Sequence, residues 1–432
     1  MGLRHSFISV ICAALVSACG ESDPKLVGER IDIRPDMVAP ENISKSVGLG
    51  AAIPFTSWTH RNGNAAHSVA MPIWTKAPEL LFAIDIGEGD SRRARITADP
   101  VIANSVVYTL DARARVTATG TGGGAIWTAD VTPGADNASD ASGGGLAYGD
   151  GTLFVTTGFG EITALDAASG QEIWTQDLDA PGTAAPTVFD GLVYVVARNG
   201  TAWALNADTG RIAWQLDATA TIASFGGGAG VAVNKDIAIF PFPSGEIIGT
   251  FPKGGLRRWS NVISGERLGR VSGLINDISS DPVISGNRAY VGNLGGQLAA
   301  LSLADGERIW TAAEGALGPV WPAGNAVFFV NDLNELVRLD AADGGSVWRV
   351  QLPQTGEKKF GRKPVTFAHY GPILAGGRLV VTSTDGKLRM FDPASGASVG
   401  TLDIPGGAAT APAVANGALF VVSKEGQLLS FR

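Results

Sequence analysis

The sequence is poor in cysteine and histidine, and this scarcity excludes several classes of site. Only Cys12 and Cys19 occur, both near the N-terminus, so the rest of the chain has no thiol for a disulfide or a CxxC motif. His60 and His67 lie close together in the chain, but only His369 follows them and no Cys, Asp or Glu cluster frames them. We therefore expect structural histidines and no metal site.

The chain also lacks a strong basic tract and a membrane-spanning hydrophobic run. With 33 Lys and Arg against 41 Asp and Glu, its formal net charge is −8, which argues against nucleic acid as a partner. The apolar run 7–16 is too short to cross a bilayer. Two basic segments, 92–95 and 358–363, are predicted to be solvated loops, with contact to an acidic partner or a phosphate-bearing lipid as the alternative.

The N-terminus has the organisation of a secretion signal. Arg4 precedes the apolar run, and Val16-Ser17-Ala18-Cys19 matches a lipoprotein box, so residues 1–18 are predicted to be removed and Cys19 to carry lipid. An ordinary signal peptide is the alternative. Gly20 after Cys19 resembles Gram-negative lipoproteins that are sorted to the outer membrane. Residues 19–50 are predicted to be a tether, with a residual helix or an added strand as the alternative, and residues 51–432 the folded domain.

The folded domain is built from one repeat. Residues 151–174, 191–214 and 286–310 each contain a short β-rich run, a glycine turn, a second run ending in an Asp/Asn-x-x-x-Gly turn, and a strand with Trp. Such units of roughly 40–50 residues are typical of four-stranded propeller blades. The fold class is therefore predicted to be an all-β, eight-bladed β-propeller of antiparallel blades. Its last blade needs a fourth strand, and Leu81–Ile86 is predicted to supply it by pairing with the C-terminal strands.

One tryptophan marks the end of each of six repeats, and a seventh repeat has Gly400 in its place. We expect these residues to pack between blades, with stacking on a cofactor as the alternative. They are Trp127, Trp174, Trp214, Trp259, Trp310 and Trp348.

The repeat, Gly-x-x-Tyr/Phe-Val…Ala-Leu-Asp-Ala-x-x-Gly-x-x-x-Trp, resembles that of the pyrroloquinoline-quinone (PQQ) dehydrogenase propellers over residues 80–432. That family contains quinone enzymes and non-enzymatic scaffolds. The lipoprotein box and the lead-in from Trp58 to Ser68 further resemble the BamB family of outer-membrane assembly lipoproteins. The BamB resemblance implies a periplasm-facing scaffold, without a cofactor, that binds periplasmic domains of the barrel-forming subunit and aids folding of outer-membrane proteins. Unfolded outer-membrane proteins are possible clients, and the lipid is the only expected membrane contact.

The same resemblance implies docking through two neighbouring interblade loops. The first matches Ile222, Ser224 and Phe225, and the second matches the stretch containing Asp277, Ser279 and Asp281. Arg270 lies in the longest insertion, 264–281, whose apolar and charged mixture suits a partner surface. The alternative is a loop that folds its own apolar residues onto the ring.

The sequence supports an enzymatic function less well than it supports a scaffold. A PQQ enzyme needs a calcium ion and an acid/base Asp, and such enzymes usually carry a vicinal disulfide. Here the repeat carboxylates Asp166 and Asp340 lie at turns, where they are expected to cap backbone N–H groups. No P-loop, zinc spacing or Ser/His/Asp order appears. We therefore predict no enzyme, with a PQQ-dependent dehydrogenase or a cell-wall or polysaccharide-binding propeller as alternatives.

Overall fold

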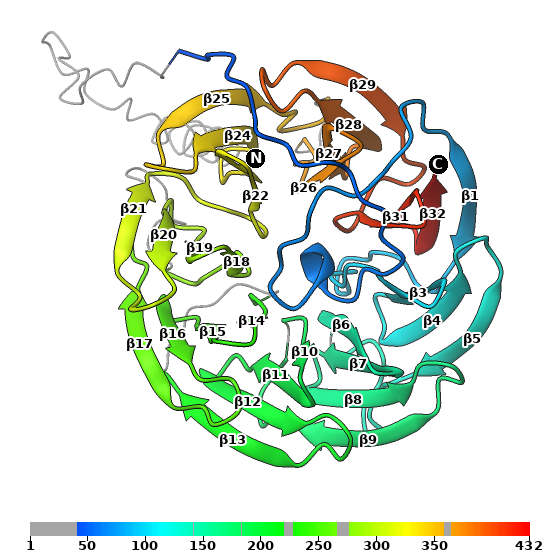
Figure 1. Ribbon diagram of the computed structural model, residues 1–432. Coiled ribbons are helices and arrows are strands. Elements are labelled where there is room, and N and C mark those ends of the chain that lie inside the picture. The colour runs from blue at the N-terminus through cyan, green and yellow to red at the C-terminus, as the bar shows by residue number, and fades with distance from the viewer. Residues whose placement is uncertain (1–40, 141, 183, 220–227, 266–275, 358–363) are drawn as a thin grey trace, which may run out of the picture. The chain divides into compact units, whose positions relative to one another are not determined.

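The computed structural model describes residues 41–140, 142–182, 184–219, 228–265, 276–357 and 364–432. These residues form eight four-stranded antiparallel sheets that follow one another around a ring (Figure 1). The eight-bladed, all-β propeller expected from the repeat is thereby confirmed. No helix among the described residues is long and apolar enough to cross a membrane.

Each blade takes four strands, numbered here from the innermost to the outermost. Blade 1 is β2 (Val101–Ala103), β3 (Val106–Leu110), β4 (Arg115–Gly120) and β5 (Ala125–Asp130). Blade 2 is β6 (Gly144–Gly149), β7 (Thr152–Thr157), β8 (Glu161–Asp166) and β9 (Glu172–Asp177). Blade 3 is β10 (Thr187–Phe189), β11 (Leu192–Val196), β12 (Thr201–Asn206) and β13 (Ile212–Asp217). Blade 4 is β14 (Ala232–Val233), β15 (Ala238–Pro241), β16 (Glu246–Thr250) and β17 (Arg257–Val262).

The second half of the ring repeats this arrangement. Blade 5 is β18 (Val283–Ser285), β19 (Arg288–Gly292), β20 (Leu298–Ser302) and β21 (Arg308–Ala312). Blade 6 is β22 (Trp321–Ala323), β23 (Ala326–Val330), β24 (Glu335–Asp340) and β25 (Ser346–Gln351). Blade 7 is β26 (His369–Ala375), β27 (Arg378–Ser383), β28 (Lys387–Phe391) and β29 (Ser398–Asp403). Blade 8 is β30 (Ala413–Ala415), β31 (Ala418–Val422), β32 (Gln427–Phe431) and β1 (Leu80–Asp85).

The ring closes by pairing its first strand with its last. Strand β1 runs antiparallel to β32, with Ile84 opposite Leu428 and Asp85 opposite Gln427. This pairing confirms the predicted closure by the segment near Leu81. It removes a long open edge that would otherwise remain beside the C-terminus.

Burial changes systematically from the centre of each blade to its rim. Inner strands such as β2 and β30 are buried at every residue, as expected for strands covered on both faces by neighbouring blades. Outer strands such as β9 and β13 alternate between exposed and half-buried residues. The apolar core therefore lies between adjacent blades, and one face of each outermost strand meets water.

Strand direction gives the ring two distinct faces. Because strands alternate in direction, the connections between blades and the hairpins between second and third strands share one end, the interblade face. The hairpins between first and second and between third and fourth strands share the other end. We call this second end the strap face, because residues 41–54, the strap, cross it.

The blade tryptophans dock on a glycine of the following blade. In blade 2, the Trp174 indole N–H donates to the Ala207 carbonyl of blade 3, 2.8 Å away. A Cβ on Gly210, which has a φ of +68°, would lie 2.6 Å from Trp174 Cε3. The indoles of Trp127, Trp214, Trp259, Trp310 and Trp348 lie in the same way against Gly170, Gly255, Gly306, Gly344 and Gly396. Only glycine combines a positive φ with such close approach, so the Trp and the Gly form one interblade contact.

The exception at Gly400 has a physical reason in the closure of the ring. A tryptophan there would dock on the turn between the third and fourth strands of blade 8, but β32 ends the chain and β1 starts separately. The Met390 side chain fills the space beside Gly400, whose Cβ would lie 2.7 Å from Met390 Cε. In blade 8 itself, Phe82 occupies the tryptophan position and lies 6.5 Å from the Phe420 ring.

The strap includes the last residues of the predicted tether, and it is hydrogen-bonded to the ring. Asn42 Nδ2 donates to the Arg349 carbonyl and its Oδ1 accepts from the Arg349 N–H, so this side chain pairs with the edge of β25. The Ile43 N–H donates to the Val347 carbonyl at 3.0 Å, and Lys45 Nζ pairs with Asp340 at 2.5 Å. Figure 1 shows the strap running from the rim at blades 6 and 7 toward the centre.

Candidate functional site: the central plug and the interblade face

The centre of the ring is filled by residues 55–74, which we call the plug. The plug includes the single turn η1 (Arg61–Gly63), which lies near the middle of the ring in Figure 1. Backbone groups of inner strands would be left unpaired along an open channel, at a cost of about 1–3 kcal/mol for each buried group. The plug supplies partners for these groups.

Every blade makes at least one hydrogen bond to the plug. The inner strands of blades 1, 2, 4 and 5 bond to its backbone through Ile102 with Trp58, Tyr148 with Thr59, Val233 with Ala65, and Ile284 with Ala66. Blades 7 and 8 do so through Gly376 with Pro72 and Asn416 with Phe55. Blades 3 and 6 use plug side chains, in the bonds of Val188 to His60 and of Asn62 to Val320. The plug is therefore an integral part of the ring.

An ionic triad, fully buried at Asp281 and partly buried at Arg61 and Asp99, ties the plug to opposite sides of the ring. Arg61 Nε lies 2.7 Å from Asp99 Oδ2, and Arg61 Nη1 lies 3.3 Å from Asp281 Oδ1. The Asp281 side chain has no solvent exposure and also accepts from the Gly230 N–H at 2.8 Å. Burial by itself lowers the pKa of Arg61, but the carboxylates of Asp281 and Asp99 outweigh it and raise that pKa above its usual value.

The plug histidines are neutral structural groups. His60 Nε2 accepts the Val188 N–H, so the ring proton is on Nδ1, which faces the Thr59 hydroxyl at 2.8 Å. Burial, helped by nearby His67, lowers the pKa of His60 to about 3. Burial also lowers the pKa of His67, whose Nδ1 contacts the Pro282 carbonyl. Among the described residues, no three His, Cys, Asp or Glu side chains form a group that could hold a metal ion.

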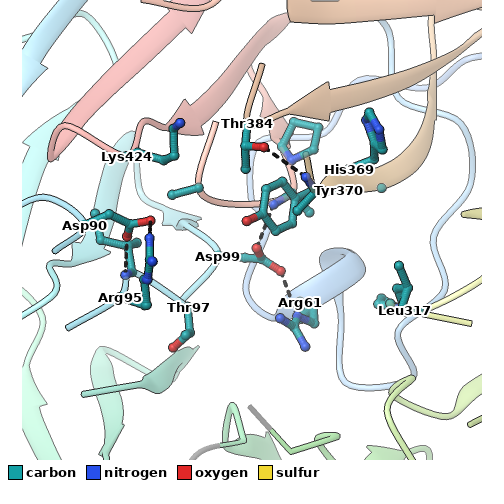
Figure 2. Close-up of a pocket in the computed structure, with 18 of the residues that line it drawn as sticks. Arg61, Asp90, Arg95, Thr97, Asp99, Leu317, His369, Tyr370, Thr384 and Lys424 are labelled. Carbon is teal, nitrogen blue, oxygen red and sulfur yellow. Dashed lines mark hydrogen bonds and ion pairs between the residues drawn. The ribbon is translucent and has the colours of Figure 1, made fainter. Parts of the chain in front are cut away.

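A funnel of about 510 Å³ opens on the interblade face above the plug (Figure 2). Its floor carries Arg61 and Asp99, and its wall carries Tyr370 and the ion pair of exposed Arg95 with half-buried Asp90, whose charged atoms are 3.1 Å apart. Burial raises the pKa of Tyr370, so its phenol stays neutral. The funnel combines apolar side chains with two carboxylates that are already bonded to arginines of the protein.

These carboxylates do not fit the calcium ion that a PQQ enzyme would need. Asp99 binds Arg61 with Oδ2 and the Ala411 N–H with Oδ1. Asp90 binds Arg95 with Oδ2 and the Ile96 N–H with Oδ1. Both oxygens of each carboxylate therefore already accept hydrogen bonds from other groups of the protein. A calcium site needs six to eight oxygen ligands free to turn toward the ion.

The docking residues expected from the sequence fall into two groups. Ile222, Ser224, Phe225 and Arg270 lie outside the described residues. Asp277 is 4 % exposed and Asp281 is fully buried in the triad, while the Ser279 hydroxyl donates to the Ala316 carbonyl and lines the funnel. The three described residues thus hold the base of the second loop. Sequence reasoning missed Arg61 and Asp99, although the polar run after Trp58 was a signal for them.

Comparisons with known proteins agree with this architecture. A family model described as "Outer membrane protein assembly factor BamB" matches residues 103–350 and 334–432. BamB of Shewanella oneidensis is 24% identical over 363 residues, 82% of this chain and 89% of that protein. BamB of Yersinia pestis is 24% identical over 316 residues, 71% of this chain and 76% of that protein.

Solved structures support the fold and do not by themselves separate functions. The crystal structure of BamB from Moraxella catarrhalis matches with a TM-score of 0.67 at 18% identity, covering 82% of this chain and 100% of that chain. A quinohemoprotein alcohol dehydrogenase from Comamonas testosteroni matches with a TM-score of 0.66 at 14% identity, covering 88% and 81%. The family model, by contrast, spans well over half of the sequence. The chain therefore belongs to the BamB family of outer membrane protein assembly factors.

Proposed function

We propose that the protein is a non-enzymatic scaffold subunit of the outer-membrane β-barrel assembly complex, and that its interblade face binds periplasmic domains of the barrel-forming subunit. The observation that carries this proposal is the plugged centre beneath a broad loop surface. The funnel carboxylates Asp99 and Asp90 are bonded to Arg61 and Arg95. A rigid ring that presents loops in this way binds a partner at a low ordering cost.

The rim of the funnel offers apolar anchors for such a partner. Val365 is 67 % exposed and Leu317 is 38 % exposed, and both line the opening. Burying these two exposed aliphatic side chains against a partner would contribute roughly 1.5–3 kcal/mol per side chain. The strands that flank residues 220–227 and 266–275, which contain Ile222, Ser224, Phe225 and Arg270, meet those residues at the interblade end of the ring. We assign the docking surface to these loops together with the funnel rim.

Buried residues of the second loop would act by positioning. Asp281 holds the Gly230 N–H and Arg61, so it fixes both neighbouring loops to the plug. Asp277 and Ser279 anchor the same loop at its base. In this proposal the partner touches the loop tips, and the lipidated Cys19 keeps the ring at the periplasmic surface of the outer membrane. A tether raises the local concentration, so modest contacts suffice.

The proposal is tested by affinity capture of the full chain from solubilised membranes, with captured proteins identified by mass spectrometry. We expect a large outer-membrane barrel protein with periplasmic domains. A double variant, Leu317→Glu with Val365→Glu, should reduce its capture about tenfold or more, because each tenfold loss corresponds to only about 1.4 kcal/mol. Ile222→Glu should act in the same direction. Asp277 is left unchanged, because a substitution at this buried residue would disturb the fold.

The matched control is Ile173→Glu, which places the same charge on β9 at the outer rim, where Ile173 is 50 % exposed. Capture by this control should equal that of the unchanged protein. The proposal is refuted if the barrel protein is absent from the captured material, or if the funnel variants stay folded and capture it undiminished.

A further inference from the structure

The turn between the third and fourth strands of blade 4 departs from blades 2 and 3 at its first residue. Phe251 stands where blades 2 and 3 have Asp166 and Asn206. The backbone of the turn is unchanged, since the Phe251 N–H donates to the Leu256 carbonyl at 2.9 Å and the Gly255 N–H donates to the Phe251 carbonyl at 3.0 Å. Blade 4 therefore keeps the turn and replaces its capping side chain with an aromatic ring.

This replacement removes side-chain hydrogen bonds that stabilise the equivalent turns of blades 3 and 7. Asn206 Oδ1 accepts from the Thr209 N–H at 3.0 Å and from its hydroxyl at 2.9 Å, and Asp392 accepts an equivalent pair from Ser395. Phe251 has no side-chain oxygen and is 49 % exposed. Its backbone partner Leu256 is 68 % exposed, where blade 3 has Arg211. An exposed apolar pair in place of a capping side chain does not stabilise the fold. Exposed apolar side chains of this kind are typical of sites that bind a partner or a membrane.

Cations surround this apolar pair. The Arg258 guanidinium lies 5.1 Å from the centre of the Phe251 ring. Lys253 pairs with Asp190 at 2.8 Å, but their side chains are 78 % and 58 % exposed, so solvent weakens that pair. Arg257 and Lys235 lie at the same end of the blade and are also exposed. The chain as a whole carries a net charge of −8, so this concentration of positive charge is local.

The turn lies at the strap face. Hairpins between third and fourth strands share one end of the ring, and the strap binds that end through the Lys45–Asp340 pair and the bond from the Lys45 N–H to the Ala394 carbonyl. The described strap residues therefore lie at the same end of the ring as Phe251 and Leu256. The docking loops proposed above are at the opposite end.

We propose that this turn, with Phe251, Leu256, Lys253, Arg257 and Arg258, is a membrane-contact site that binds a bilayer containing anionic phospholipid. A projecting turn places its Phe and Leu at the depth of the lipid headgroups, and the cations around it face the phosphates. The site goes beyond the proposed scaffold function, because it gives the ring a second, protein-borne attachment that does not depend on the partner. It also extends the expectation that the lipid alone contacts the membrane.

The test uses the full chain carrying Leu256→Cys, labelled with an environment-sensitive fluorophore. The protein is reconstituted in phosphatidylcholine vesicles with or without one third phosphatidylglycerol, and nitroxide-bearing lipids serve as quenchers. We expect emission at position 256 to shift to shorter wavelength and to be quenched in the anionic vesicles. Arg257→Gln with Arg258→Gln should weaken this contact about thirtyfold, because each cation near an anionic surface contributes roughly fivefold.

The matched control is Arg211→Cys, which places the same label at the equivalent turn position of blade 3. Protein without an introduced cysteine measures the background from Cys12 and Cys19. Stronger quenching at 256 than at 211, lost at high salt, supports the site. Equal quenching at the two positions overturns it, since a tether alone would give that result. If the emission at position 256 shifts only when the solubilised assembly complex is added, and not with anionic vesicles, the turn binds an acidic protein. That result also overturns the membrane-contact site.

Discussion

Replacing Arg61 with methionine is the sharpest perturbation of the plug. The substitution keeps a long apolar stem but removes the only described cation that bonds to both Asp99 and Asp281. The two carboxylates then remain buried without their shared counter-charge. Asp281 is the more costly of the two, because its side chain is fully buried while that of Asp99 is 10 % exposed.

The expected cost is large relative to the stability of a domain. Removing one partner of a buried ion pair costs about 3–5 kcal/mol, out of a total free energy of unfolding of about 5–15 kcal/mol. The loss should appear first as local opening, since the plug bonds to each blade through only a few hydrogen bonds, while the blades have their own sheets and cores. Neutralising the carboxylates as well, in Arg61→Met with Asp99→Asn and Asp281→Asn, should recover most of the stability.

Two measurements check this expectation. Urea unfolding gives the change in the free energy of unfolding, and hydrogen exchange reports the amide protons of Ile102, Val233 and Ile284, which donate to the plug backbone. These amides should lose protection in Arg61→Met, while amides inside the blades keep theirs. A cost below about 1 kcal/mol would show that the triad is not a stabilising centre. A triple variant as unstable as the single one would show that uncompensated charge is not the cause.

Three further predictions concern other parts of the ring. Trp174→Ala should cost about 3–5 kcal/mol and Gly210→Ala about 1–3 kcal/mol, with the double variant costing less than the sum, as measured by urea unfolding. His60 has a pKa of about 3 in the folded chain against 6.5 unfolded, so the unfolded state binds more protons between these values and stability falls as the pH falls below 6.5. From pH 6.5 to 5 the loss is about 2 kcal/mol, which His60→Gln should remove; an unchanged pH dependence would contradict the buried neutral histidine. Phe251→Asn should raise the melting temperature, because restored turn hydrogen bonds contribute about 0.5–1.5 kcal/mol; a lower melting temperature would contradict the capping argument.

The architecture could be predicted from the sequence because the same pattern of strands, turn glycine and tryptophan recurs in successive blades. Each copy carries the same turn glycine and the same tryptophan, and the structure joins them, as in the contact between Trp174 and Gly210. Closure by β1 was also predictable, because Leu81–Ile86 has the character of an outermost strand and the last blade lacked one. Such local signals suffice where neighbouring residues form the element.

The plug and the strap could not be predicted in this way. Their partners are hundreds of residues away in the chain, as with Asn42 and Arg349 or Arg61 and Asp281. These segments also have no repeat and little regular secondary structure, so no periodicity marks them. The polar residues that the sequence suggested as partner contacts, such as Asp281, proved to be buried for the same reason: only the folded ring shows what lies opposite them.

The two faces of the ring have different chemistry, and this difference constrains how the protein works. The interblade face carries aliphatic anchors such as Val365 around a funnel, whereas the strap face carries the strap and the cationic turn with Phe251. A ring attached at its strap face would present the interblade face away from the bilayer, toward periplasmic domains of a partner. If both proposals hold, variants at the turn should change orientation and membrane proximity without weakening capture of the barrel protein. Variants at the funnel rim should do the reverse, so the two sites are separable within one chain.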